Sequence, residues 1–294
     1  MTLASVSSIP AVERPLLDQL DMAFPLRHLV FPEARTAVRE CGQGPTVVLL
    51  HGIGSGAASW LQVARQLSGQ ARVIAWDAPG YGRSSPLAEA RPRAESYARR
   101  LEHVLEALEI ERCVLVGHSL GAMTALACAT GQAASRIARV MLISPARGYG
   151  AAARRAIGEQ VRAGRLDHLE RHGVEAMAEE RSHRLLSTRA SASQLDWVRW
   201  NMARLNPAGY RQAVELLCGD DLLRFPPLTM PCEVHCGEDD GITQPGECQL
   251  IADHLHARFS LIPRAGHASP IEQPEAVTER IASALKASLE GTRP

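Results

Sequence analysis

The stretch VLVGHSLGA, residues 114–122, places a single serine between two glycines directly after an unbroken apolar run. The run predicts a buried strand, and the small residues after it predict a sharp turn into a helix. Ser119 has Gly117 two positions before it and Gly121 two positions after it. Side chains at these two positions would collide with the neighbouring strand and helix. In this setting the G-x-S-x-G pattern indicates a nucleophile whose hydroxyl projects from a strained turn.

Further short apolar runs alternate with helical patterns along the chain. Beside CVLVGHS (113–119), strands are predicted at TVVLLHG (46–52), RVIAWD (72–77), RVMLIS (139–144), CEVHCG (232–237) and FSLIPRAG (259–266), after a hairpin formed by 25–31 and 36–44. Helices are predicted at 57–67, 95–108, 120–130, 245–256 and 274–289. The alternation predicts an α/β fold, with a mostly parallel twisted sheet and helices on both faces. Ligands bind such sheets at the carboxyl ends of the strands.

One interval lacks strand signals. Residues 145–228 are rich in arginine and alanine, and AMAEERSHRLL and QLDWVRWNMARL are their clearest helical pieces. Such a length exceeds a plain crossover loop, so we expect an inserted helical cap, or lid, over the carboxyl edge of the sheet. The predicted organisation is an N-terminal extension (1–23), a core (24–144 and 229–294) and the cap (145–228).

Composition excludes several classes of protein. The 294 residues include 32 basic and 32 acidic side chains, so no net field attracts nucleic acid or an anionic membrane surface. The first thirty residues lack the apolar core of a secretory signal, and no apolar stretch is long enough to cross a membrane. Seven scattered cysteines without CxxC spacing indicate buried thiols in a reducing compartment. We therefore expect a cytoplasmic protein with a small, largely neutral substrate, without cofactor or metal. The sequence is also compatible with a homo-oligomer.

A serine nucleophile needs a base and an acid that orients the base. His267 lies between glycine and small residues just after the last predicted strand, which favours it as the base. The acid is expected after the penultimate strand, in HCGEDDGI. Asp240 is the preferred candidate because Ile242 can pack back to hold this loop, and Asp239 is the alternative. His118, although it is next to the serine, is not predicted to be the base.

Acyl transfer also requires backbone donors for an oxyanion. The N–H of Leu120 lies at the start of a helix, where the helix dipole adds to its effect. The segment LLHGIGSGAASW (49–60) offers the second donor, with the N–H of Ile53 preferred and that of Gly54 as the alternative. His51 is interpreted as a structural hydrogen-bonding group.

These motifs, together with WDAPGYGRSS (76–85) and GHASPIEQPEAV (266–277), resemble the α/β-hydrolase fold family, in particular its cap-bearing serine hydrolases. The resemblance implies a Ser119, Asp240 and His267 triad. HGIGSGA is similar to the loop of carbon–carbon hydrolases that act on ring-fission products. Those enzymes usually carry tryptophan after the histidine, where this chain has Ala268. HASPIEQPE resembles the loop of enol-lactonases and small carboxylesterases.

The leading hypothesis is hydrolysis of an ester, lactone or thioester through an acyl-enzyme. Four cap side chains and one neighbour of the serine are candidates to contact substrate: Trp197, Trp200, Met202, Tyr210 and His118. The alternative is carbon–carbon bond hydrolysis, which needs a cation for a substrate carboxylate. Candidates for that cation are Arg147, Arg181, Arg184, Arg199 and Arg204. A third hypothesis is a catalytically silent binding protein on the same fold.

Overall fold

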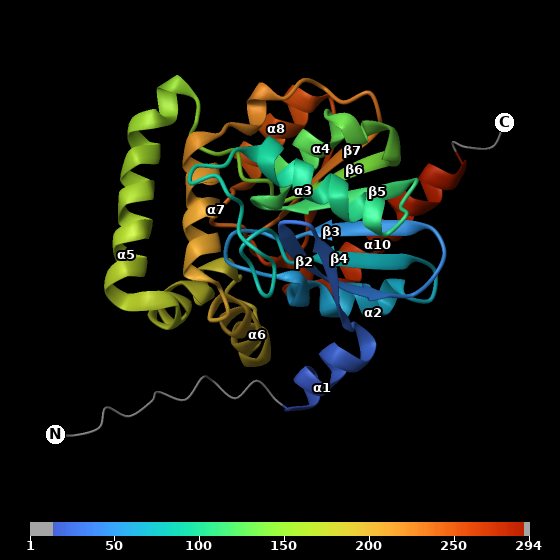
Figure 1. Ribbon diagram of the computed structural model, residues 1–294, viewed down its shortest axis with the longest axis horizontal. Helices are drawn as coiled ribbons and strands as arrows, with labels where there is room; N and C mark the ends of the chain where they lie inside the picture. Colours follow the sequence, from blue (N-terminus) through green and yellow to red (C-terminus); the bar gives the residue numbers. More distant parts are fainter. Residues whose placement is uncertain (1–13, 291–294) are drawn as a thin grey trace.

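The computed structural model describes residues 14–290 and contains one eight-stranded sheet (Figure 1). The strand order is β1-β2-β4-β3-β5-β6-β7-β8. β1 and β2 form an antiparallel hairpin, β2 is antiparallel to β4, and the remaining pairs are parallel. The strand bounds are β1 Leu26–Phe31, β2 Ala34–Cys41, β3 Thr46–Leu50, β4 Arg72–Trp76, β5 Cys113–His118, β6 Ile137–Ile143, β7 Cys232–Gly237 and β8 Arg258–Ile262. The predicted fold class is confirmed.

Helices cover both faces of the sheet. One face packs against α3 (Ala94–Ala107), α4 (Gly121–Ala129) and α8 (Pro245–Leu255), and the other against α2 (Leu61–Leu67) and α10 (Pro274–Glu290). Because both faces are covered, the central strands are continuous apolar runs, and every residue of β5 is buried. Two helices were not expected. They are α1 (Arg14–Ala23), which packs Leu20 and Phe24 beside α2 and α10, and the short α9 (Ser269–Glu272).

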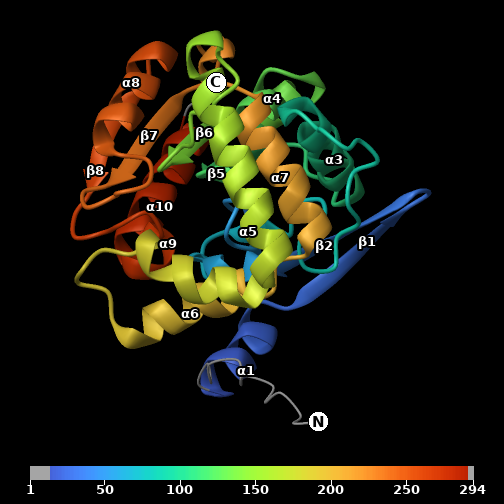
Figure 2. The ribbon, with the colours of Figure 1, turned by 90° about the vertical axis from the view of Figure 1, so that its left-hand side faces the viewer.

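The interval expected to form a cap contains three helices and no strand of the sheet. They are α5 (Arg155–Arg181), α6 (Ala192–Met202) and α7 (Pro207–Gly219), and Figure 2 shows α5 and α7 running side by side. A capping box between Ser191 and Gln194 begins α6, and the Asn206 side chain caps α7. Gly173 interrupts α5 with a positive φ of 76°. Short 3₁₀ helices lie at Ala57–Trp60, Gln132–Arg136, Ala152–Arg154, Ser182–Leu185 and Leu222–Arg224.

The parallel register gathers polar side chains at one edge of the sheet. Gly117 on β5 lies between Leu50 on β3 and Leu142 on β6, so the residues that follow these strands are neighbours. They include His51, Ser119 and Ser144. Within residues 14–290, no helix is long and apolar enough to cross a membrane.

Candidate active site

Ser119 lies at the tip of the turn between β5 and α4. Its φ is 53°, in the left-handed region that a non-glycine residue seldom adopts. Its N–H donates to the carbonyl of Ile143 at 3.0 Å, which anchors the turn to β6. A Cβ at Gly117 would lie 2.8 Å from the Cα of Ala122, and one at Gly121 would lie 2.7 Å from the carbonyl oxygen of Leu50. The two glycines therefore allow the close packing that holds Ser119 in this strained conformation.

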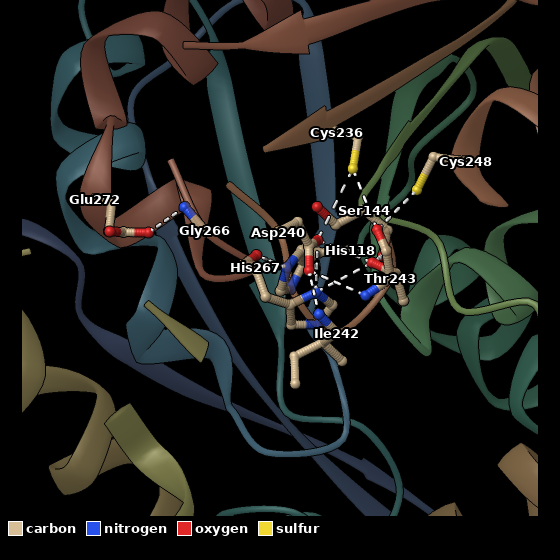
Figure 3. A network of polar contacts seen from close by, with 10 residues as sticks. All are labelled: His118, Ser144, Cys236, Asp240, Ile242, Thr243, Cys248, Gly266, His267 and Glu272. Carbon is tan, nitrogen blue, oxygen red and sulfur yellow. Dashed lines mark hydrogen bonds and ion pairs between the residues drawn. The ribbon is translucent and has the colours of Figure 1, made fainter. Parts of the chain in front are cut away.

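His267 and Asp240 meet in the loops after β8 and β7 (Figure 3). The Nδ1 of His267 lies 2.9 Å from Oδ2 of Asp240, and both side chains are buried. Because a carboxylate only accepts, Nδ1 carries the proton and Nε2 is left with a lone pair. Asp239, the alternative acid, is exposed and pairs with Arg189 instead.

The carboxylate of Asp240 is held in its charged form. Its Oδ1 accepts the N–H groups of Ile242 at 2.8 Å and Thr243 at 3.0 Å. Burial alone would raise the pKa of Asp240, but the charge and hydrogen bond of His267 and the N–H of Ile242 lower it well below its usual range. Asp240 is thus suited to stabilise a positive charge on His267.

Thr243 is a member of the site that the sequence analysis missed. Its hydroxyl lies 2.9 Å from Oδ2 of Asp240, 3.2 Å from Nδ1 of His267 and 3.0 Å from the carbonyl oxygen of Ser144. The hydroxyl can donate to either oxygen while it accepts weakly from His267. The side chain fixes the acid and the imidazole against the end of β6. The only sequence signal was its place three residues after Asp240.

His118 holds the backbone of the base. Its Nε2 donates to the carbonyl of His267 at 2.8 Å. Burial and the neighbouring His267 lower the pKa of His118 to about 3, so it stays neutral. With Nε2 engaged, His118 acts on the position of His267, although it also lines the cavity described below.

His51 fixes the peptide that carries the second expected oxyanion donor. The N–H of Ala78 donates to Nε2 of His51 at 3.0 Å, so the proton is on Nδ1, which donates to the carbonyl of Gly52 at 2.8 Å. Burial lowers the pKa of His51, which keeps this neutral tautomer. A trans peptide directs its C=O and N–H to opposite sides, so the N–H of Ile53 points away from His51. Within residues 14–290, the N–H groups of Ile53 and Leu120 have no acceptor.

A cavity of about 330 Å³ contains these groups. Ser119, His267, Ile53 and Leu120 line it, together with side chains from the interval 145–228. In the described part of the chain no hydrogen bond joins Ser119 Oγ to Nε2 of His267. Such bonds often tighten only when substrate is bound. The loop after β3 lies against the serine, because a Cβ at Gly52 would be 2.8 Å from Cβ of Ser119.

The side chains expected to contact substrate differ in their position relative to the cavity. Met202 and Tyr210 line the cavity, but Trp197 and Trp200 do not. The two indoles stack on each other, with centroids 4.7 Å apart, and pack in the apolar cluster beside α2 and α10. The prediction that they line the pocket is therefore wrong, because they occupy the face of α6 turned toward the core. Val198 and Asn201, which are next to the two tryptophans in the sequence of α6, line the cavity.

Arginines from the cap interval also reach the cavity. Of the five proposed from the sequence, Arg147, Arg181 and Arg184 line it. Arg199 instead pairs with Glu179 and Asp196, and Arg204 stacks over the Trp200 ring. Arg154 and Arg165 line the cavity and were missed. Among residues 14–290, no group of three or more His, Cys, Asp or Glu side chains is arranged to hold a metal ion.

Comparison with known proteins shows to which family the chain belongs. Residues 47–280 match the model of the alpha/beta hydrolase family, and the chain belongs to that family. An esterase from Thermogutta terrifontis, solved with malate bound, is 26% identical with a TM-score of 0.78, over 90% of this chain and 98% of that one. The enol-lactonase from Burkholderia xenovorans LB400 is 23% identical with a TM-score of 0.78, over 88% and 100% of the two chains.

A curated relative matches over a shorter segment. The 2-hydroxy-6-oxononadienedioate/2-hydroxy-6-oxononatrienedioate hydrolase of Cupriavidus pinatubonensis is 36% identical over 116 residues, which is 38% of this chain and 40% of that protein. Matches to curated relatives span 32% to 40% of their length. The family resemblance inferred from the motifs is confirmed.

Proposed function

We propose that this chain is a serine hydrolase that cleaves a carboxylic ester, lactone or thioester through an acyl-enzyme. The observation that carries the proposal is the position of Ser119, strained at the end of β5, in one cavity with a histidine that a buried aspartate orients. The likeness to an esterase at 26% identity supports the reaction class. Apolar side chains in the cavity, including Met177, Leu185 and Met202, suit a small and largely apolar acyl group.

The mechanism follows from the roles of the residues. Ser119 Oγ attacks the carbonyl carbon while Nε2 of His267 takes its proton, and Asp240 stabilises the imidazolium. The oxyanion accepts hydrogen bonds from the N–H groups of Leu120 and Ile53. The leaving alcohol or thiol takes the proton from His267 as the tetrahedral intermediate collapses to the acyl-enzyme. Water then attacks, with His267 again as base, and releases the acid and free Ser119.

Replacement of Ser119 by alanine is the direct test. We expect Ser119→Ala to lose nearly all hydrolysis of short p-nitrophenyl esters, a fall of about 10⁴-fold or more in kcat. The variant should also lose covalent labelling by a fluorophosphonate probe, measured by intact-mass spectrometry. Ser193→Ala, at an exposed serine of α6, serves as the matched control. Hydrolysis by Ser119→Ala at the wild-type rate would sink the proposal.

The same labelling separates an enzyme from a silent binding protein. A protein that had lost hydrolysis would leave Ser119 unactivated, and the probe would not add to it. Labelling of the wild-type chain at Ser119 therefore speaks against a silent receptor, and absence of labelling favours one.

Carbon–carbon bond hydrolysis is the second candidate function. The curated relative from Cupriavidus pinatubonensis, named for a dienedioate and a trienedioate, favours it. Ala268 stands where carbon–carbon hydrolases usually carry tryptophan, and this difference favours ester hydrolysis. Turnover of ring-fission products and of short esters, measured side by side, decides between the two bonds.

A further inference from the structure

The wall that the cap interval contributes to the cavity carries an unusual excess of positive charge. Five arginines line the cavity: Arg147, Arg154, Arg165, Arg181 and Arg184. Two of them have carboxylate partners, since Arg154 pairs with Glu247 and Arg147 lies 3.6 Å from Asp221. The other three differ. Arg165 donates to the neutral hydroxyl of Tyr210 at 3.0 Å, and the guanidinium groups of Arg181 and Arg184 form no ion pair or hydrogen bond with any residue in 14–290.

The fold brings these three arginines to the lining of one cavity. On an unbroken helix Arg165 and Arg181 would be roughly 24 Å apart. The positive φ of Gly173 breaks α5 between them, and Figures 1 and 2 show the bend at one end of this helix. Beyond the bend the chain runs in a different direction, toward α6, and Nε2 of His168 lies 3.5 Å from Oε2 of Glu180 across the bend. Arg184 follows directly in the short helix Ser182–Leu185.

The pKa of Arg181 responds to the charges of the other two arginines. Burial lowers the pKa of Arg181, and the charges of Arg165 and Arg184 lower it further. Tyr210 and Glu180 act in the opposite direction. Glu180 is exposed and is the carboxylate nearest in sequence, yet it contacts His168 and forms no ion pair with Arg181. Three like charges therefore line one cavity, and none of them forms an ion pair with a carboxylate of residues 14–290.

Several other arginines of the cap interval pair with carboxylates. Arg162 pairs with Glu215, Arg211 with Glu170, and Arg171 with Asp167. Partly buried cations such as Arg165 and Arg181 cost stability when like charges lie near them, unless an anion offsets the repulsion. Guanidinium groups bind carboxylates through paired hydrogen bonds, which makes a bound anion the natural complement.

Two tyrosines relate this cationic cluster to the nucleophile. Arg165 donates to the hydroxyl of Tyr210, and the charges of both residues act on the pKa of Tyr81. The hydroxyl of Tyr81 donates to the carbonyl of Ile53 at 2.9 Å, and Ile53 is the expected oxyanion donor. The apolar side chains of Met177 and Met202 also line the cavity. The cavity thus combines a reaction centre, an apolar wall and a cationic cluster.

We propose that Arg165, Arg181 and Arg184 form a carboxylate-binding subsite, and that the substrate is an amphipathic acyl compound with a second, unreactive carboxylate. Its apolar part packs against the methionines while its scissile carbonyl reaches Ser119. This inference rests on the proposed function and deepens it. It departs from the neutral substrate expected from composition, because the net charge of zero averages over the whole chain.

Matched substrates test the subsite through kinetics. Mono-4-nitrophenyl adipate carries the second carboxylate, and 4-nitrophenyl hexanoate is its neutral counterpart. A second pair, the butyryl esters of 4-hydroxybenzoate and of phenol, places the anion on the leaving group. We expect wild type to prefer the anionic member of at least one pair. Arg181→Gln and Arg184→Gln should lower kcat/KM for that member by about 10- to 100-fold, while the neutral ester changes by less than about twofold. Arg171→Gln, at an exposed arginine of α5, is the control.

Binding without turnover separates this proposal from the proposed function. Monomethyl adipate, which has a free carboxylate, should bind Ser119→Ala with higher affinity than neutral methyl hexanoate in isothermal titration calorimetry, and Arg181→Gln in that background should abolish the difference. Equal binding of both esters overturns the subsite even if the fluorophosphonate labels Ser119 of the wild-type chain. Selective binding of monomethyl adipate, with no labelling of the wild-type chain, supports the subsite and refutes the hydrolase. Arg184 is exposed, so its replacement should not disturb folding. Arg184→Gln therefore tests the subsite if Arg181→Gln fails to fold.

Discussion

Single residues at this site act through hydrogen bonds that fix other groups, and Thr243 is the sharpest case. Valine has nearly the same shape but no hydroxyl, so Thr243→Val removes the contacts to Asp240, His267 and the Ser144 carbonyl. We expect kcat to fall about tenfold, which corresponds to about 1.4 kcal/mol, because the imidazole is less well oriented. Steady-state kinetics with a short ester gives the comparison. Thr243→Ser keeps the hydroxyl and should remain near wild type. Equal rates for all three proteins would show that Asp240 alone orients the base.

The sequence predicted the site residues that can be recognised from their residue type and from their position after a strand. Ser119, Asp240 and His267 each follow a predicted strand, and the structure brings Asp240 and His267 into contact. Their catalytic roles stay predictions. Thr243 was missed because a threonine in a turn looks like any loop residue until the turn folds its hydroxyl back. Trp197 and Trp200 were misassigned because helical periodicity gives the spacing of side chains but not which face meets a cavity.

At the scale of elements, the central strands β3, β4 and β5 were predictable because they are buried on both faces and therefore almost entirely apolar. The hairpin and the core helices also matched to within a few residues. The short helix α9 has no periodic signal, and α1 lies where an extension was expected. The bend of α5 depends on one glycine, Gly173, whose positive φ is a property of the folded chain.

The helix α9 connects the base to the cap interval through Glu272. The buried carboxylate of Glu272 accepts the N–H of Gly266 at 2.5 Å and the N–H of Ser187 at 2.8 Å (Figure 3 shows the first contact). The N–H of Ala268 also donates to the carbonyl of Leu185 at 2.7 Å. The segment that carries His267 is thereby bonded to the loop that precedes α6.

Glu272→Gln tests this connection. The amide retains one acceptor oxygen but turns an NH₂ group toward a backbone donor, so one bond is lost and one N–H is left buried and unpaired. We expect kcat to fall about tenfold with a smaller change in KM, since His267 is displaced rather than substrate. Glu275→Gln, at an exposed glutamate of α10, provides the control for these kinetics. A change in KM alone would assign Glu272 to substrate binding instead.

At the scale of the whole molecule, Asp220 joins the end of the cap interval to the core. Its side chain is fully buried and accepts hydrogen bonds from Arg93 at 3.0 Å, from Arg224 at 2.5 and 3.0 Å, and from the N–H of Ala94 at 3.0 Å. Ala94 begins α3, so the carboxylate also interacts favourably with the helix N-terminus. The side chain of Asp220 thus couples the end of α7 to α3, a helix that covers the sheet.

This coupling predicts a pH-dependent loss of stability in Asp220→Asn. Burial would raise the pKa of Asp220, but the hydrogen bonds from Arg224 and the N–H of Ala94 lower it overall. A carboxyl with a lowered folded-state pKa stabilises the fold above its unfolded pKa of about 4, and this contribution is lost as the pH falls through the folded-state pKa. At pH 7 the variant removes the buried charge that Arg93, Arg224 and the N–H of Ala94 bind, while Arg224 keeps Glu95 as a partner, so we expect a loss of about 1–3 kcal/mol in the free energy of unfolding.

Urea denaturation of both proteins, followed by circular dichroism, measures this loss across the pH range. The difference between wild type and Asp220→Asn should be largest near neutral pH and should shrink below about pH 4, because wild type then protonates the same carboxyl. Asp167→Asn removes an exposed carboxylate that pairs with Arg171, and it should cost less than about 1 kcal/mol at any pH. A loss for Asp220→Asn that is independent of pH would mean that packing of the side chain, and not its charge, couples the cap interval to the core.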